Sequence, residues 1–324
     1  MRAAQIVSHD GPAALKVGEA PDPEPGDNQV LIETYVAGVT FPDLLMTRGE
    51  YQVAPDFPFV PGSEVAGTVK SAPSGSGLTA GDRVVAFPGI GGFAELTPSR
   101  AEAVFSLPPN LSFAQGAALP MNYLTCQFGL DRRGRLKTGD TVLVHGAAGG
   151  IGTAAIQLAK AMGARVIAVV STDTKADVAR AAGADEAVLA EGFLPAVKEL
   201  TGGRGVDIVV DPVGGDRFTD SLRSLAPEGR VLVIGFTGRE IPTVKVNRLL
   251  LTNTEVVGVG WGAFALRTPG FLQEQWDALL PHIESGAIDP PLGSSYPLEQ
   301  AADALVELDE RRATGKVTIE VRPT

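Results

Sequence analysis

The pattern of apolar and polar positions changes twice along the chain. Between residues 30 and 97, short apolar runs alternate with turn residues, as in VLIETYVAGV, EVAGTVK, APSGSG, DRVVAF and FAELT. Several short strands at this spacing predict a compact β-barrel or sandwich. From Thr141, the apolar segments TVLVHG, ARVIAVV, VDIVV and GRVLVIG alternate with the helical segments IGTAAIQLAKAMG and TKADVARAAG. Strands that alternate with helices predict a parallel, doubly wound sheet.

The pattern changes again after residue 265. An aromatic helical segment, FLQEQWDALLPHIESG, precedes PLGSSYPLEQ, a helix in AADALVELDERR and a closing strand, KVTIEV. That strand lies far along the chain from the parallel run, so we expect the tail to return to the first domain. The predicted fold is therefore α/β with two domains, one formed by residues 1–122 and 266–324 and the other by residues 123–265.

Composition narrows the class of protein. The 324 residues include 27 Lys and Arg against 38 Asp and Glu, for a net charge of −11, which disfavours nucleic acid and anionic membranes as partners. No basic stretch followed by an apolar core opens the chain, and no run approaches the roughly 20 apolar residues of a membrane-spanning helix. We therefore expect a cytoplasmic protein.

The single cysteine, Cys126, cannot close a disulfide within the chain. It lies in MNYLTCQFGL, a mostly apolar helical stretch, where packing explains it better than catalysis. Any redox chemistry must then come from a bound cofactor.

A cofactor site is indicated by VLVHGAAGGIG, in which an apolar strand leads through a glycine-rich turn into a helix. The residues from Ala147 to Gly152 form an A-x-G-x-x-G variant of the dinucleotide fingerprint. Gly149 would let the backbone approach a pyrophosphate, Gly152 would allow close helix–strand packing, and the amides from Gly150 and Ile151 onward would face the anion. Strand before and helix after make this context specific.

The end of the next strand distinguishes the two nicotinamide cofactors. In NAD-binding proteins an acidic side chain there accepts a hydrogen bond from the 2′-hydroxyl of the adenosine ribose. This chain has Ser171 instead, with Lys175 four residues later. A hydroxyl and an ammonium suit the 2′-phosphate of NADPH, which a carboxylate would repel. A lone Lys175 would read as a solvated helix-start lysine, but together with the missing acid it favours NADPH.

Two later strand ends could line the nicotinamide half of such a site. They are Asp211–Gly215, which includes Val213, and Ile234–Phe236. Asp211 could be taken for a base. Because it ends a strand before Pro212, we expect it to cap the loop instead.

Seven segments together resemble the quinone oxidoreductase (zeta-crystallin-like) branch of the medium-chain dehydrogenase/reductase superfamily. In chain order they are GVTFPDLLMTRGEYQ, PFVPGSEVAG, GDRVVAF, ALPMNYLT, HGAAGGIG, DPVGG and NRLLLTNTEVVGVGWGAF. The resemblance covers essentially the whole chain. It implies a GroES-like β-barrel-type domain for the substrate, a Rossmann domain for NADPH, an active site in the cleft between them, and a homodimer joined through EVVGVGW.

The zinc enzymes of this superfamily hold their metal with cysteine and histidine, and this chain departs from that pattern. Ser63 stands where they have a histidine before glutamate, and Val39-Thr40 where they have the early cysteine. The three histidines, His9, His145 and His282, are isolated and are expected to be surface or packing residues. We therefore predict a zinc-independent enzyme.

The predicted absence of zinc limits which classes of substrate the enzyme could reduce. Without a Lewis-acid metal an unactivated ketone would be a hard substrate, whereas a quinone or similar conjugated carbonyl spreads the incoming charge onto an oxygen that needs only a hydrogen-bond donor or water. The resemblance implies catalytic roles for Tyr51, which delivers a proton in related enoyl reductases, for Thr40, which replaces an asparagine of many relatives, and for Thr125 near the nicotinamide. It also implies cofactor contacts from Ile234, Gly235, Phe236, Val259, Gly260 and Trp261.

Some expectations stay open. Tyr51 could instead be a packed or loop tyrosine, and Asp43 is expected to organise its loop. Some relatives have a tyrosine near the 2′-phosphate where this chain reads DEAVLA, so NADPH affinity would depend more on Ser171 and Lys175. A 2-enoyl thioester or enone reductase would use the same cofactor and Tyr51, and a non-enzymatic NADPH-binding protein would share the glycine turn.

Overall fold

The computed structural model describes residues 1–52 and 55–323, which divide into two compact units. The first unit comprises Met1–Met121, Gly270–Asp277 and Pro290–Thr324, and the second comprises Asn122–Pro269 and Ala278–Asp289. Residues 122, 266–269 and 278–289, which the sequence pattern assigned to the first domain, thus group with the second. A contact within the second unit holds the end of the last segment: the Gln157 side chain donates to the carbonyl of Asp289 at 2.7 Å and accepts from its amide at 3.1 Å.

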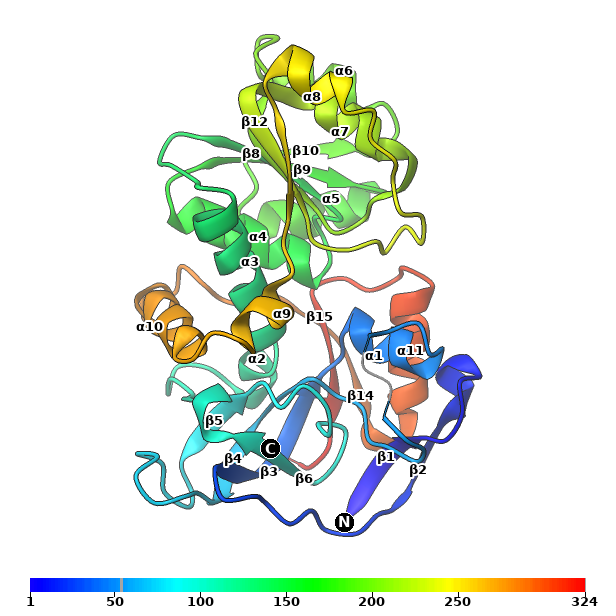
Figure 1. Ribbon diagram of the computed structural model, residues 1–324, viewed down its shortest axis with the longest axis vertical. Coiled ribbons are helices and arrows are strands. Elements are labelled where there is room, and N and C mark those ends of the chain that lie inside the picture. The colour runs from blue at the N-terminus through cyan, green and yellow to red at the C-terminus, as the bar shows by residue number, and fades with distance from the viewer. Residues whose placement is uncertain (53–54, 324) are drawn as a thin grey trace. The chain divides into compact units, whose positions relative to one another are not determined.

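The first unit is built on a seven-stranded sheet (Figure 1). Its order is β14-β15-β3-β4-β5-β7, and β6 also pairs with β3. The strands are β3 (Gln29–Gly38), β4 (Glu64–Ser71), β5 (Arg83–Ala86), β6 (Leu96–Arg100), β7 (Val104–Ser106), β14 (Leu292–Pro297) and β15 (Lys316–Glu320). The closing strand β15 runs antiparallel to β3, so the end of the chain lies in this unit.

A second, smaller sheet and short helices complete the first unit. The sheet is the antiparallel pair β1 (Arg2–Ile6) and β2 (Leu15–Glu19). The helices are η1 (Gly11–Ala14), α1 (Phe41–Thr47), η2 (Ala101–Ala103), α2 (Phe113–Gly116), η6 (Leu298–Gln300) and α11 (Ala301–Asp309). Alternating apolar side chains of β3 and β4, including Val30, Ile32 and Val65, form the core together with Leu305 of α11 and Ile319 of β15.

The second unit contains a six-stranded parallel sheet of order β10-β9-β8-β11-β12-β13. The strands are β8 (Thr141–His145), β9 (Arg165–Val170), β10 (Glu186–Leu189), β11 (Val206–Asp211), β12 (Leu225–Val233) and β13 (Glu255–Gly258). The central strands β8, β9 and β11 are mostly apolar and buried, as expected where a sheet is covered on both faces, whereas β10 and β13 at the two edges are more exposed. The predicted α/β fold with a doubly wound parallel sheet is therefore confirmed.

Helices connect these strands (Figure 1). In chain order the helical segments are η3 (Pro120–Leu124), α3 (Thr125–Gln127), η4 (Phe128–Arg133), α4 (Gly150–Ala161), α5 (Asp173–Ala181), α6 (Phe193–Leu200), η5 (Gly215–Arg217), α7 (Phe218–Ser224), α8 (Asn247–Thr252), α9 (Trp261–Ala265) and α10 (Phe271–Glu284). The residues of η3 and of α10 divide between the two units. The chain turns from β8 towards β9 and β10, then returns to β11 on the other side of β8. This reversal is the point at which such sheets bind ligands, beyond the carboxyl ends of their strands.

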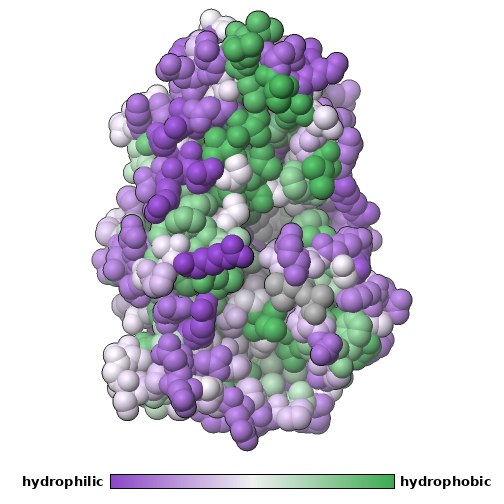
Figure 2. Space-filling view, in the orientation of Figure 1, coloured by the Kyte–Doolittle hydropathy of each residue, from purple (hydrophilic) through white to green (hydrophobic). Residues whose placement is uncertain are grey.

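The surface of the second unit carries an apolar area, seen in Figure 2 over α8. Leu250 and Leu251 of α8 are each 77% exposed. Ile241 and Val246, which precede α8, and Val256 in β13 are exposed as well. We call these five residues the α8 patch. Among the helices described, none is both long and apolar enough to cross a lipid bilayer.

Candidate cofactor and substrate sites

The turn between β8 and α4 is shaped by its glycines. A Cβ on Gly152 would lie 2.3 Å from the carbonyl oxygen of Gly146 and 2.5 Å from the Cα of Ala147, so α4 can approach the strand only because Gly152 has no side chain. A Cβ on Gly149 would meet nothing nearer than the oxygen of Gly146, at 3.5 Å. The space over Gly149 is therefore open, and the first amides of α4 begin beside it. A pyrophosphate fits this arrangement.

The segment from Pro120 to Arg133 packs against this turn. Asn122 is buried, and its amide would lie 2.6 Å from a Cβ on Gly150. Cys126 donates to the carbonyl of Ile151 across 3.4 Å, and burial raises the pKa of its thiol well above the usual value. This confirms that Cys126 is a packing residue. Thr125, the first residue of α3, is buried and directly precedes Cys126 on this segment.

Ser171 and Lys175 lie where the second strand of the sheet ends. Ser171 is exposed directly after β9, and the Thr172 hydroxyl caps α5 by accepting from the backbone amide of Lys175 at 3.3 Å. Lys175 thus belongs to the first turn of α5. Ala190, which follows β10, is bonded through its amide to the carbonyl of Val170 at 2.8 Å, so the ends of these two strands lie side by side.

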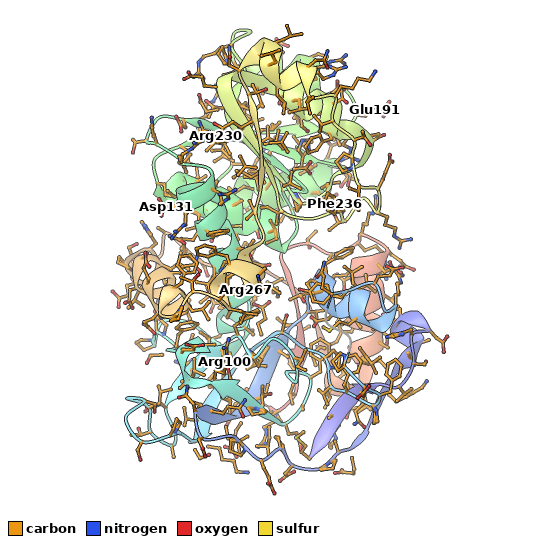
Figure 3. All side chains as sticks on the ribbon, viewed as in Figure 1. Arg100, Asp131, Glu191, Arg230, Phe236 and Arg267 are labelled. Atoms are coloured by element: carbon orange, nitrogen blue, oxygen red, sulfur yellow. The ribbon has the colours of Figure 1, made fainter. Side chains whose placement is uncertain are left out.

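The ends of β11 and β12 are tied together. Asp211 accepts from the amides of Val213 and Gly214, each at 2.9 Å, which confirms its predicted role as a loop cap. The amide of Gly238 donates to the carbonyl of Val213 at 2.8 Å, and a Cβ on Gly214 would lie 2.9 Å from the Phe236 ring. Figure 3 labels Phe236 on the loop after β12. Val213, Ile234, Gly235 and Phe236 are therefore grouped at one edge of the sheet, all partly exposed.

The three residues predicted after β13 differ in exposure. The amide of Val259 continues the sheet by donating to the carbonyl of Val233 at 2.9 Å. Val259 and Trp261 are both buried, with Trp261 only 3% exposed at the start of α9, whereas Gly260 is exposed. The Trp261 ring is thus a packed side chain, and Gly260 offers its backbone.

His145 ends β8 as a buried residue, as predicted from its isolation in the sequence. Its Nε2 lies 2.9 Å from the Ser221 hydroxyl, and its ring packs edge-on against that of Phe193, with 5.0 Å between the ring centroids. Burial lowers the pKa of His145 to about 4. His145 is therefore neutral near pH 7.

This burial makes stability depend on pH. Because the unfolded chain takes up a proton on His145 at about pH 6.5 and the folded chain only near pH 4, stability present above pH 6.5 is lost as the pH falls. We expect His145 to cost about 2 kcal/mol of unfolding free energy between pH 7 and pH 5. Urea unfolding of wild type and His145→Asn at both pH values measures this, and equal pH dependence in the two proteins would contradict it.

In the first unit, three hydrogen-bond donors converge on the buried carboxylate of Asp43. Its Oδ2 accepts from the amide of Thr40 at 2.8 Å and from the Thr40 hydroxyl at 2.6 Å, and its Oδ1 accepts from the amide of Gly62 at 3.0 Å. The Ser63 hydroxyl lies 3.1 Å from that of Thr40. Burial raises the pKa of Asp43 to about 6, although the hydrogen bonds from Thr40 and Gly62 oppose the shift.

Tyr51 is half-buried against the core of the first unit. Burial, and then the charge of Asp43, raises the pKa of its phenol. The phenol therefore stays protonated at neutral pH and can donate a hydrogen bond. The structure thus brings Thr40, Ser63 and Asp43 together, and the charge of Asp43 acts on Tyr51.

Next to this cluster, Glu64 and Lys316 form an ion pair inside the protein. Glu64 is 0% and Lys316 4% exposed, and Glu64 also accepts from the amide of Met121 at 2.7 Å. The charge of Glu64 is therefore compensated by a side chain. Within residues 1–52 and 55–323, no group of three or more His, Cys, Asp and Glu side chains is arranged to hold a metal ion.

The sequence predicted that Asp43 organises its loop, and the structure confirms this, but the prediction missed the bond from the Thr40 hydroxyl to Asp43, the hydroxyl of Ser63 and the packing of Asn122. One sequence feature could have revealed the first: Thr40 and Asp43 have the spacing of a capping box, in which the two residues bond each other. The contacts to Gly62 and Ser63 join separate segments and leave no comparable local pattern.

Comparisons with known proteins agree with these features. Residues 26–109 match the family model described as alcohol dehydrogenase GroES-like domain, and residues 150–285 match the one described as zinc-binding dehydrogenase. Quinone oxidoreductase-like protein 2 of Rattus norvegicus is 37% identical over 92% of this chain and 86% of its own length.

Two solved structures show the same similarity along the whole chain. A probable oxidoreductase from Mycobacterium abscessus is 45% identical, with a TM-score of 0.91 and 99% of both chains covered. The Escherichia coli quinone oxidoreductase complexed with NADPH is 30% identical, with a TM-score of 0.90, and covers 99% of this chain and 100% of its own. The chain therefore belongs to the quinone oxidoreductase family of the medium-chain dehydrogenase/reductase superfamily.

Proposed function

We propose that this protein is an NADPH-dependent oxidoreductase that reduces a quinone or a similar conjugated carbonyl compound without zinc. The observation that carries the proposal is the turn between β8 and α4. There the lack of a side chain on Gly152 lets the helix lie close to the strand, and Gly149 leaves room for a pyrophosphate. The similarity to quinone oxidoreductases, one of them an NADPH complex, supports the same cofactor and substrate class.

The chain's own residues have a limited task in this reaction. When bound, NADPH supplies the hydride. The protein must hold the acceptor and donate a hydrogen bond to the oxygen on which negative charge develops. Tyr51 suits this role because its phenol keeps its proton at neutral pH. A conjugated acceptor needs no stronger activation than this hydrogen bond, because the negative charge that develops on it is delocalised.

We expect Tyr51→Phe to lower kcat about a hundredfold, the usual contribution of a positioned proton donor. The ring and its packing are retained, so the binding of NADPH should be unchanged. Steady-state rates with 1,4-benzoquinone, together with NADPH affinity from fluorescence titration, measure the two effects. A Tyr51→Phe enzyme with the wild-type kcat would remove Tyr51 from the mechanism.

Zinc independence is part of the proposal although one matching family model is described as a zinc-binding dehydrogenase. The side chains at the relevant positions, Thr40 and Ser63, are hydroxyls bonded to each other, and that of Thr40 also bonds Asp43, whereas zinc prefers thiolate, imidazole and carboxylate ligands. Metal analysis of the purified protein should find no stoichiometric zinc, and exhaustive chelation should leave turnover unchanged. One bound zinc per chain, or loss of activity on chelation, would overturn this part.

Cofactor preference is proposed to depend on the end of β9. We expect Ser171→Asp to weaken NADPH binding at least about tenfold, because the carboxylate repels the 2′-phosphate and accepts from the ribose hydroxyls of NADH instead. Dissociation constants for both cofactors measure the change, and Thr174→Asp, on the exposed face of α5, provides a control. An unchanged ratio of the two affinities would show that Ser171 does not face the 2′-phosphate.

The acceptor class separates the proposal from its alternatives. NADPH oxidation is followed with quinones, simple enones and 2-enoyl thioesters. The proposal expects quinones to give the highest kcat/KM. Preference for the enoyl thioester would favour an enoyl thioester reductase instead. If none of these acceptors leads to oxidation of NADPH, a non-enzymatic NADPH-binding protein would be favoured.

We also propose that the protein is a homodimer joined at β13. This strand ends the six-stranded sheet, so its outer edge has no neighbour in the sheet, and the α8 patch beside it is apolar and exposed. A second copy of β13 would cover both. Light scattering should give the mass of a dimer, reduced to that of a monomer by Leu250→Glu. A wild-type monomer at micromolar concentration would contradict this.

A further inference from the structure

We propose that Asp43 is a positioning residue that fixes the direction of the hydrogen bonds running from Ser63 through Thr40, and thereby prevents Thr40 from serving as proton donor to the acceptor. The inference rests on the proposed function and deepens it. Within the polar cluster around Asp43, it assigns proton donation to Tyr51 alone and a structural role to the hydroxyls that Asp43 holds. It changes the role of Thr40, which the family resemblance placed among the catalytic residues.

The direction follows from counting hydrogens. A threonine hydroxyl has one proton to donate. The hydroxyl oxygen of Thr40 lies 2.6 Å from Oδ2 of Asp43, which is the strongest acceptor among its neighbours. The contact of 3.1 Å between Thr40 and Ser63 must then be donated by Ser63. Oδ2 also takes the amide of Thr40 and Oδ1 the amide of Gly62, so the carboxylate acts only as an acceptor.

This arrangement does more than cap a helix. A capping box needs only the two residues at the start of α1, whereas Asp43 also holds the amide of Gly62 and, through Thr40, the hydroxyl of Ser63, which precedes β4. Thr40, Asp43 and Ser63 are all buried. Solvent therefore does not compete for these bonds, and the orientation of the Thr40 proton is set by the protein alone.

The charges around Asp43 support its ionised form. Lys316 of β15 faces it, although Glu64 of β4 shares that ammonium group, and Tyr51 senses the charge of Asp43. At the far end of α1, Arg48 is paired with Asp309 of α11. With Asp43 ionised and Thr40 bonded to it, the phenol of Tyr51 is the group of this cluster that keeps a proton to donate.

The direction can be tested without turnover by following the ionisation of Asp43 through its carboxyl carbon in ¹³C NMR. If Thr40 donates to Asp43, Thr40→Val removes a bond that favours the charged form and raises the pKa of Asp43, and Thr40→Ser restores it. The matched control is Thr47→Val, because the Thr47 hydroxyl is buried on the same helix but donates to the carbonyl of Leu44 at 2.6 Å. It should leave the pKa of Asp43 unchanged.

The kinetic arm uses NADPH and 1,4-benzoquinone. We expect Thr40→Val to lower kcat only about threefold, against about a hundredfold for Tyr51→Phe. Thr40→Ala serves for both arms should Thr40→Val not fold. A pKa of Asp43 that is unchanged or lowered by loss of the Thr40 hydroxyl, or a loss of kcat as large as that of Tyr51→Phe, overturns the inference. If the wild type oxidises no NADPH with any acceptor, the proposed function fails, while the NMR titration still decides the direction.

Discussion

Replacing Gly152 by alanine is expected to lower the affinity for NADPH at least about a hundredfold, because the turn proposed to bind the pyrophosphate cannot keep its shape. The new Cβ would lie 2.3 Å from the carbonyl oxygen of Gly146 and 2.5 Å from the Cα of Ala147, and both are backbone atoms that cannot rotate away. The start of α4 must therefore move from the end of β8. Fluorescence titration with NADPH measures the affinity.

Two further glycines separate geometry from general destabilisation. Gly149→Ala adds a Cβ with no protein atom nearer than 3.5 Å, so the fold should be kept while the methyl group occupies the space of the pyrophosphate. Gly18→Ala in β2 adds a Cβ with nothing within 4 Å and should change neither stability nor affinity. Wild-type affinity in Gly152→Ala would show that the cofactor does not use this turn.

Lys316→Met is expected to lower the free energy of unfolding by about 3–5 kcal/mol, the usual effect of removing one partner of a buried ion pair. Glu64 is fully buried, and it would lose the only charge that faces it at hydrogen-bond distance among the described residues. The amide of Met121, which donates to Glu64 at 2.7 Å, cannot replace an ammonium group. Urea unfolding at pH 7 measures the loss.

The double variant Glu64→Gln with Lys316→Met should be clearly more stable than Lys316→Met alone, because no buried charge remains and the glutamine oxygen can still accept from Met121. As a control, Arg204→Met breaks the exposed pair of Arg204 with Asp207, in which Arg204 is 59% exposed, and should cost less than about 1 kcal/mol. Equal losses for Lys316→Met and Arg204→Met would mean that the buried pair contributes no more than a surface one.

Much of the second unit could be predicted because its determinants are local. The strands β8, β9 and β11 are continuous apolar runs, and the glycine turn after β8 is a contiguous motif. The cap formed by Asp211 was likewise predictable, since the residues it bonds, Val213 and Gly214, follow within three positions. By contrast β10 is only four residues long, EAVL, and its partly exposed residues give no apolar run to detect.

The first unit was less predictable because its polar site is assembled from distant segments. Asp43 meets Gly62 across 19 positions, and Lys316 meets Glu64 across 252. No periodicity marks a contact at such separation, and only the fold brings the groups together. The grouping of residues 278–289 with the second unit is a similar case, since the end of this segment is held by the side chain of Gln157, 132 positions before Asp289.

Under the proposed function, this protein reduces a quinone at the expense of NADPH without a metal. The most direct measurement is anaerobic turnover of the chelator-treated protein with NADPH and 1,4-benzoquinone, following absorbance at the NADPH band and the hydroquinone formed, against a protein-free blank. We predict one hydroquinone for each NADPH consumed, at a rate proportional to protein concentration. Consumption of NADPH no faster than in the blank would contradict the claim.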